Sequence, residues 1–160
     1  MGGSAAQARL PDLGQYRRAE QPVSRVVGLD HGSRRIGIAV GESETGMAFA
    51  RPALRRTREP ADLAAIVALA KAEGTTRVVL GLPRNMDGSE GPQAAAARAF
   101  GEQLRSAGLW VEFVDERLTS WEASEQMATA GRHPARASGE LDSAAAAVIL
   151  QQYLDAQEAR

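Results

Sequence analysis

The stretch from Val26 to Val40 reads Val-Val-Gly-Leu-Asp-His-Gly-Ser-Arg-Arg-Ile-Gly-Ile-Ala-Val and decides the fold. Its two ends are rich in β-branched residues, and a glycine-containing turn separates them. This pattern predicts an antiparallel hairpin of strands 26–30 and 36–40. Residues 47–53 predict a third, weaker strand that Pro52 closes.

Beyond the hairpin, the apolar period lengthens from two residues to about 3.6, which indicates helices alternating with short strands. The expected elements are a helix from Pro60 to Gly74, a strand 77–80, a loop 81–91, a helix from Pro92 to Gly108, a strand 110–114, a short helix from the capping box 119–122 to about residue 130, and a last helix over about 140–157. This order predicts an α/β fold with a mixed five-stranded sheet, three antiparallel strands followed by two parallel ones, and helices on both faces.

Composition limits the class of protein. The 160 residues suit one domain, expected at 25–157 behind a flexible leader at 1–24. The absence of cysteine excludes disulfides, cysteine-bound zinc and thiol catalysis. No apolar run is long enough for a membrane span, and no signal peptide is evident, so we expect no membrane partner and a cytoplasmic location. The low aromatic content predicts an aliphatic core, with small residues where elements pack closely.

Basic residues are almost all arginine, because Lys71 is the one lysine among 19 basic side chains. Several cluster in the sequence, namely Arg34, Arg35, Arg51, Arg55, Arg56 and Arg58. The planar guanidinium suits phosphate, although a solvated surface would explain the same clusters. The formal net charge of −1 neither supports nor excludes a nucleic-acid partner.

Three carboxylates stand out. Asp30 closes the first strand, where it could simply begin a turn. Glu116 follows the strand 110–114 and shares a face with Val114, although a solvated strand end would also explain it. Asp142 heads the apolar stripe of the last helix, where it could instead serve the helix dipole.

Taken together, these acids indicate a metal site. The carboxyl ends of parallel strands meet at one edge of a sheet, and a helix packed on that sheet could bring Asp142 to the same edge. Oxygen ligands without histidine favour Mg²⁺ or Mn²⁺ over zinc. Such a cluster is typical of phosphoryl transfer, in which the ions activate water and stabilise the attacking and leaving oxygens.

Residues 25–155 resemble the YqgF family, also called RuvX-like, which is described as pre-16S rRNA nucleases related to Holliday junction resolvases. The matching segments are GLDHGSRRIGIA at 28–39, GLPRNMDGSEGPQ at 81–93, DERLTS at 115–120, and LDSAAA at 141–146 followed by ILQQYL at 149–154. The resemblance implies an RNase H-like fold and a cytoplasmic nuclease that processes the 5′ end of the 16S rRNA precursor. It also implies that Asp30, Glu116 and Asp142 are the catalytic, metal-binding acids.

Substrate contacts are expected from arginines and one asparagine, namely Arg34, Arg35, Arg84, Asn85, Arg117 and Arg136. Structural roles remain open for Asn85, in a turn, and for Arg117, in a salt bridge. The segment before Asp142 departs from the family, because it carries at most three basic residues where the family has a run of them. Fewer phosphate contacts would mean weaker and less salt-sensitive binding. Position 145 is alanine, so no fourth acid is evident.

Three alternatives stay open. A Holliday junction resolvase would act on branched DNA as a two-fold dimer, whereas an RNA nuclease could be a monomer. The sequence Asp30-His31-Gly32 also resembles the phosphate loop of actin-like ATPases, which need two such domains around a nucleotide. A non-catalytic nucleic-acid-binding or interaction domain could keep the fold, although its signature would be loss of the three acids.

Overall fold

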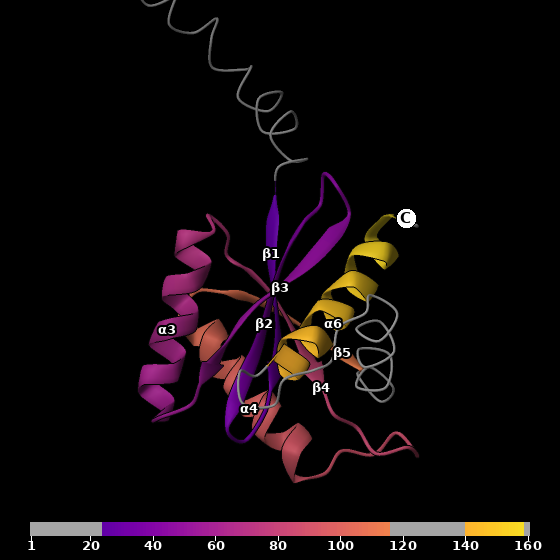
Figure 1. Cartoon of the computed structure of the whole chain (residues 1–160). Helices are drawn as coiled ribbons and strands as arrows, with labels where there is room; N and C mark the ends of the chain where they lie inside the picture. The colour runs from indigo at the N-terminus through magenta and orange to yellow at the C-terminus, as the bar shows by residue number, and fades with distance from the viewer. Residues whose placement is uncertain (1–23, 116–139, 159–160) are drawn as a thin grey trace, which may run out of the picture.

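A computed structural model describes residues 24–115 and 140–158 of the chain, and the side chains of 140–142 are not among the parts described (Figure 1). The elements are β1 (Arg25–His31), β2 (Arg35–Glu42), β3 (Met47–Arg55), α3 (Glu59–Ala72), β4 (Arg77–Leu82), α4 (Pro92–Ser106), β5 (Trp110–Asp115) and α6 (Glu140–Glu158). None of the helices in these ranges is both long and apolar enough to span a bilayer.

The five strands form one sheet in the order β3-β2-β1-β4-β5. β1 pairs antiparallel with β2, and β2 pairs antiparallel with β3. β4 runs parallel to β1, and β5 runs parallel to β4. The mixed sheet of three antiparallel and two parallel strands is therefore confirmed.

Helices cover both faces of the sheet, and each face has its own core (Figure 1). On one face, α3 and α4 pack on large side chains of the strands, including Leu29, Ile36 and Leu80. On the other, α6 lies against smaller residues such as Ala39. The apolar stripe predicted for the last helix is buried, and it comprises Ala145, Ala146, Ile149 and Tyr153.

The expectation that Pro52 closes the third strand was wrong, because β3 continues to Arg55. The register against β2 steps from Ile38↔Arg51 to Ile36↔Leu54, so two β3 residues lie opposite one β2 residue in a bulge. Proline is tolerated at a bulge of an edge strand, where its missing N–H breaks no ladder.

Candidate active site

Asp30 lies at the carboxyl end of β1, one residue before the strand ends, and is half-buried. It borders a cleft of about 490 Å³ formed by the β1–β2 turn, Arg56, Pro83 and the first turns of α4. The turn is tight, because the Gly32 N–H donates to the Arg35 carbonyl at 2.9 Å. A carboxylate at this edge of the sheet is therefore presented to an open space.

Small residues let α6 approach the face of β1 that carries Asp30. A Cβ on Gly28 would lie 2.8 Å from the Leu150 Cβ, and one on Gly41 would lie 2.8 Å from the Leu154 Cδ1. Gly41 pairs with Val26 at the start of β1, and Leu154 lies above it, whereas Leu150 and Ala146 lie above Gly28. The residue numbers of α6 therefore decrease towards Asp30, so the N-terminus of the helix points to the Asp30 end of β1.

The first turn of α6 is tied to the sheet near that end. The Ile38 N–H donates to the Ser143 Oγ at 3.4 Å, and Ile38 pairs with Leu29. Four helix residues rise about 6 Å and two strand residues rise about 6.6 Å. Because Ala146 lies over Gly28, this spacing puts the backbone of position 142 at the level of Asp30.

β5 ends at the same edge of the sheet as β1, because β1, β4 and β5 are mutually parallel. Val114 of β5 packs against the core under α6, so even-numbered positions of this strand face the helix that covers Asp30. The α6-facing side of β5 thus reaches the edge of the sheet at which Asp30 lies.

His31 points away from this face, although it is the next residue after Asp30. Its ring packs against Phe100 at 4.8 Å between centroids, and its Nε2 is buried without a hydrogen-bond partner among the described residues. Burial, and next the charge of Arg56, lower the pKa of His31 to about 4. The imidazole is thus neutral and its ring packs on the core, although His31 also lines the cleft beside Asp30.

An ion pair that the sequence did not reveal fixes the turn beside Asp30. Arg56 donates from Nε to the Asp62 Oδ2 at 3.2 Å and from Nη1 to the Gly32 carbonyl at 3.0 Å. Asp62 is 2% exposed, and its second oxygen accepts the Thr57 N–H at 3.1 Å. The hairpin turn is therefore held to the start of α3. An arginine six residues before an aspartate at a helix start was the available signal.

The other predicted contact residues divide into two groups. Arg34 and Arg35 lie at the end of the hairpin next to Asp30, where Arg34 is exposed. Arg84 lies near two carboxylates, at 3.4 Å from Glu90 and 3.9 Å from Asp115. Asn85 is exposed and belongs to a turn, with its Nδ2 donating to the Ser89 Oγ at 3.0 Å, as the structural alternative expected.

The remaining predicted site residues lie outside the described part of the chain. They are Glu116, Arg117 and Arg136, and Asp142 is described only as a helical position of α6. Within the parts of the chain that are described, no three acidic or histidine side chains gather in a metal-binding cluster. Of the predicted triad, the structure thus places the Asp30 side chain and the backbone of position 142.

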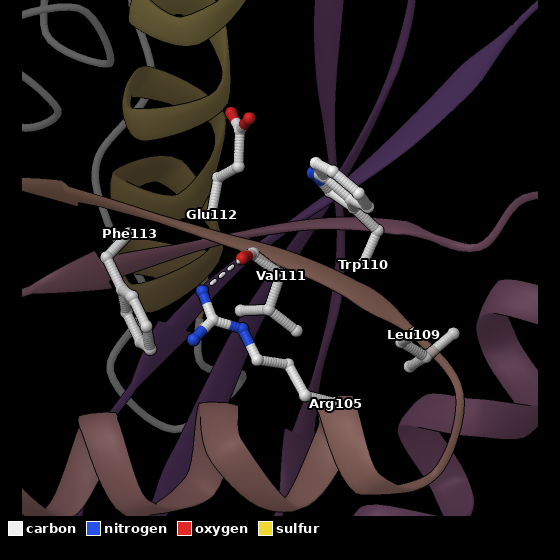
Figure 2. Close-up of a pocket in the computed structure, with 6 residues that line it drawn as sticks. All are labelled: Arg105, Leu109, Trp110, Val111, Glu112 and Phe113. Atoms are coloured by element: carbon white, nitrogen blue, oxygen red, sulfur yellow. Dashed lines mark hydrogen bonds between the residues drawn. The ribbon is translucent and has the colours of Figure 1, made fainter.

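A second hollow, of about 640 Å³, lies along the outer edge of β5 (Figure 2). Figure 2 shows Trp110 and Glu112 on one side of the strand, and Arg105, Val111 and Phe113 on the other. The Arg105 Nη2 donates to the Val111 carbonyl at 2.6 Å, and its guanidinium lies 5.0 Å from the centre of the Phe113 ring. Arginine on an edge carbonyl protects the strand from pairing with another chain, and the single acid here makes a poor metal site.

Comparison with known proteins identifies the family. The model of the RuvX family, described as Holliday junction resolvase, matches residues 24–156. The chain belongs to the RuvX family. "Putative pre-16S rRNA nuclease" is the name of relatives from Anaeromyxobacter dehalogenans (strain 2CP-1), 46% identical over 82% of this chain and 96% of the relative, and from Myxococcus xanthus, 45% identical over 82% and 88%. This RuvX-family chain is a nuclease, in agreement with the expectation from its sequence.

Solved structures support the fold. RuvC of Thermus thermophilus, in complex with a Holliday junction substrate, superposes with a TM-score of 0.53 at 14% identity, over 84% of this chain and 95% of RuvC. The large terminase nuclease of phage G20c gives a TM-score of 0.52 at 14% identity, over 81% of each chain. At such identities the likeness concerns the fold alone, which is RNase H-like as expected.

Proposed function

We propose that this RuvX-family nuclease cleaves phosphodiester bonds with Mg²⁺ or Mn²⁺ held by Asp30, Glu116 and Asp142, in a nuclease domain at 25–157. The observation that carries the proposal is the convergence of three chain segments on one edge of the sheet. Asp30 is the penultimate residue of β1 there, β5 ends there at Asp115, one residue after Val114, and the N-terminal half of α6 lies above Gly28.

The donor set suits a hard divalent cation. Asp30 offers carboxylate oxygens at the cleft, and the Nε2 of the neighbouring His31 is buried rather than presented to the cleft. When bound, the metal would activate water and stabilise charge on the phosphate oxygens. The chain's own part is to hold Asp30 in place through the tight Gly32 turn and the Arg56–Asp62 pair.

The proposed substrate is the 5′ end of pre-16S rRNA, after the names of the relatives, and the cytoplasmic location expected from the sequence accompanies it. The proposed contacts to this substrate are Arg34, Arg35, Arg84, Asn85, Arg117 and Arg136.

Cleavage of branched DNA is the second candidate, because the family description is that of a junction resolvase. That activity requires two active sites in a homodimer, whereas RNA cleavage is open to a monomer.

The test incubates the purified chain with labelled pre-16S rRNA and, separately, with a four-way DNA junction, with and without Mn²⁺. We expect metal-dependent cleavage of the RNA. Asp30→Asn should reduce cleavage by more than the roughly 10–100-fold typical of losing a group that only supports a metal ligand. Glu116→Gln and Asp142→Asn should behave alike.

Asp155→Asn is the matched control, because Asp155 is an exposed acid near the far end of α6. It should cleave like the wild type, and circular dichroism should show all variants folded. An active, folded Asp30→Asn protein would refute the metal site. Preferred cleavage of the junction, together with a dimeric mass by analytical ultracentrifugation, would select the second candidate.

A further inference from the structure

Two sets of arginines among the described residues differ in their ion pairs. Five that lie on the sheet edges and helices have a carboxylate oxygen at 2.7–3.5 Å, and they are Arg25, Arg51, Arg84, Arg98 and Arg105. At the end of the hairpin beside Asp30, the exposed Arg34, Arg55 and Arg58 make no ion pair with any residue of the described ranges. Within the described residues, these three guanidinium groups therefore have no ion-pair partner, in a chain whose net charge is −1.

The sheet register places two arginines side by side at this end. Arg35 of β2 is paired directly with Arg55 of β3. Like charges in directly opposed cross-strand positions destabilise a sheet. The bulge at Pro52 produces this alignment, because it shifts the β3 register just before Arg55. An anion lying across both guanidinium groups would be attracted by both charges.

Arg35 and Arg55 lie on the face of the sheet that carries Asp30. Asp30 pairs with Gly37, and Arg35 is two residues from Gly37 on the same strand. Because side chains alternate between the two faces of a strand, Asp30 and Arg35 lie on one face, and Arg55 lies there too because it pairs with Arg35. Gly37 has no side chain to separate the acid from the arginines. Asp30, Arg35 and Arg55 therefore follow one another across this face of the sheet, with the buried Gly37 opposite Asp30.

The backbone under these arginines is fixed. The Arg56 N–H donates to the Arg34 carbonyl at 2.9 Å, and the Arg56 guanidinium holds the Gly32 carbonyl and Asp62. Arg58 is the N-cap residue of α3, directly after this anchored segment. The four side chains, Arg34, Arg35, Arg55 and Arg58, are thus presented from a preformed surface, which we call the arginine surface.

We infer that the arginine surface binds the phosphate backbone of the substrate strand next to the bond cut at Asp30, on the β3 side of the site. This inference rests on the proposed function and adds Arg55 and Arg58 to the expected contacts. Guanidinium groups bind phosphate through paired N–H donors, and each neutralised phosphate releases counterions. An acidic protein segment is the competing occupant.

The test measures binding separately from cleavage. Fluorescence anisotropy in EDTA follows a labelled single-stranded RNA bound to the wild type, Arg55→Gln, Arg58→Gln and the double variant, over a series of salt concentrations. Each substitution should weaken binding several-fold and lower the slope of log K against log salt by about one. With Mn²⁺ and sub-saturating substrate, cleavage should fall by the same factor as binding.

Arg77→Gln is the matched control, since Arg77 is exposed at the start of β4 and makes no ion pair within the residues described. It should bind RNA like the wild type. The inference would be overturned if the folded double variant bound RNA with the affinity and salt slope of the wild type. It would also be overturned if the double variant lost binding to poly-glutamate but kept its binding to RNA. If no substrate is cleaved by the wild type, the proposed function fails, while the binding series still decides on the arginine surface.

Discussion

The two faces of the sheet are built from residues of different size, and the difference explains where the site lies. Under α3 and α4 the strands present large side chains, which include Val27, Leu29 and Ile36. Under α6 the same strands present Gly28, Ala39 and Gly41. The first face fills a core, whereas the second lets a helix backbone come close. Close approach brings the start of α6 to the end of β1, next to Asp30.

The largest effect on stability should come from the face with large side chains. Phe100 of α4 is fully buried between the sheet and the helices. Phe100→Ala should lower the free energy of unfolding by about 3–5 kcal/mol, because it removes buried apolar surface and leaves a cavity. Urea denaturation measures the loss. Phe49→Ala is the matched control, because Phe49 is 54% exposed on the edge strand, and it should change stability by roughly 0.5 kcal/mol or less.

The next effect should come from the ion pair at the border between core and site. Asp62→Asn should cost about 3 kcal/mol, because it leaves Arg56 partly buried without its counter-charge. It should also reduce cleavage, since Arg56 holds the Gly32 carbonyl two residues after Asp30. Glu102→Gln breaks an exposed pair with Arg105 and should cost no more than about 1 kcal/mol. An equal decrease in the free energy of unfolding for Asp62→Asn and Glu102→Gln would contradict this reasoning.

A smaller loss of stability, with a larger loss of activity, is expected on the α6 face. Gly28→Ala puts a Cβ 2.8 Å from the Leu150 Cβ and 3.1 Å from the Ala146 carbonyl, so α6 must shift. We expect a cost of about 1–3 kcal/mol from overpacking. Cleavage at a temperature where the variant is fully folded should still fall, because the first turn of α6 moves relative to Asp30.

Gly91→Ser is the control for the glycine series. The nearest atoms to a Cβ at Gly91 are 3.8 Å away in Asn85, and serine is favourable at this N-cap position of α4. Its stability should be unchanged or slightly raised. If Gly28→Ala kept full activity per folded molecule, the position of α6 would not matter for the site.

Much of this arrangement could be predicted from the sequence because it depends on local period. Alternation in β1 and β2 predicted the hairpin, and the 3.6-residue stripe of the last helix predicted its buried face. The bulge at Pro52 could not be predicted, because it depends on how β2 pairs with β3 beyond the proline.

Asp62 and the arginine surface show the limit of local reasoning. In the sequence, Asp62 is one of two acids in the first turn of α3, where the helix dipole explains it. Its burial depends on Arg56, which reaches it from the end of β3. The opposition of Arg35 and Arg55 likewise depends on strand register. The predicted triad is placed only through Asp30, because Glu116 and the Asp142 side chain lie outside the described residues.

The smallest expected effect compares neighbours on opposite faces, Asp30 and His31. The pKa of His31 is lowered from 6.5 to about 4 by burial and by Arg56, so between these values the unfolded chain binds more protons than the folded one. Stability must therefore fall as pH drops from about 6.5 to 4. Because His31 is only half-buried, solvent screening keeps the change modest.

His31→Phe isolates this contribution, because a phenyl ring can pack on Phe100 but cannot be protonated. Urea denaturation at a series of pH values should show a constant difference in the free energy of unfolding between the two proteins above pH 6.5 or so. Below that, the wild type should lose stability relative to the variant until pH approaches 4. Other titrating groups, Asp30 included, are common to both proteins and cancel to first order. Parallel curves through the whole range would mean that the pKa of His31 is the same in the folded and the unfolded chain, so that burial against Phe100 does not disfavour the charged imidazole.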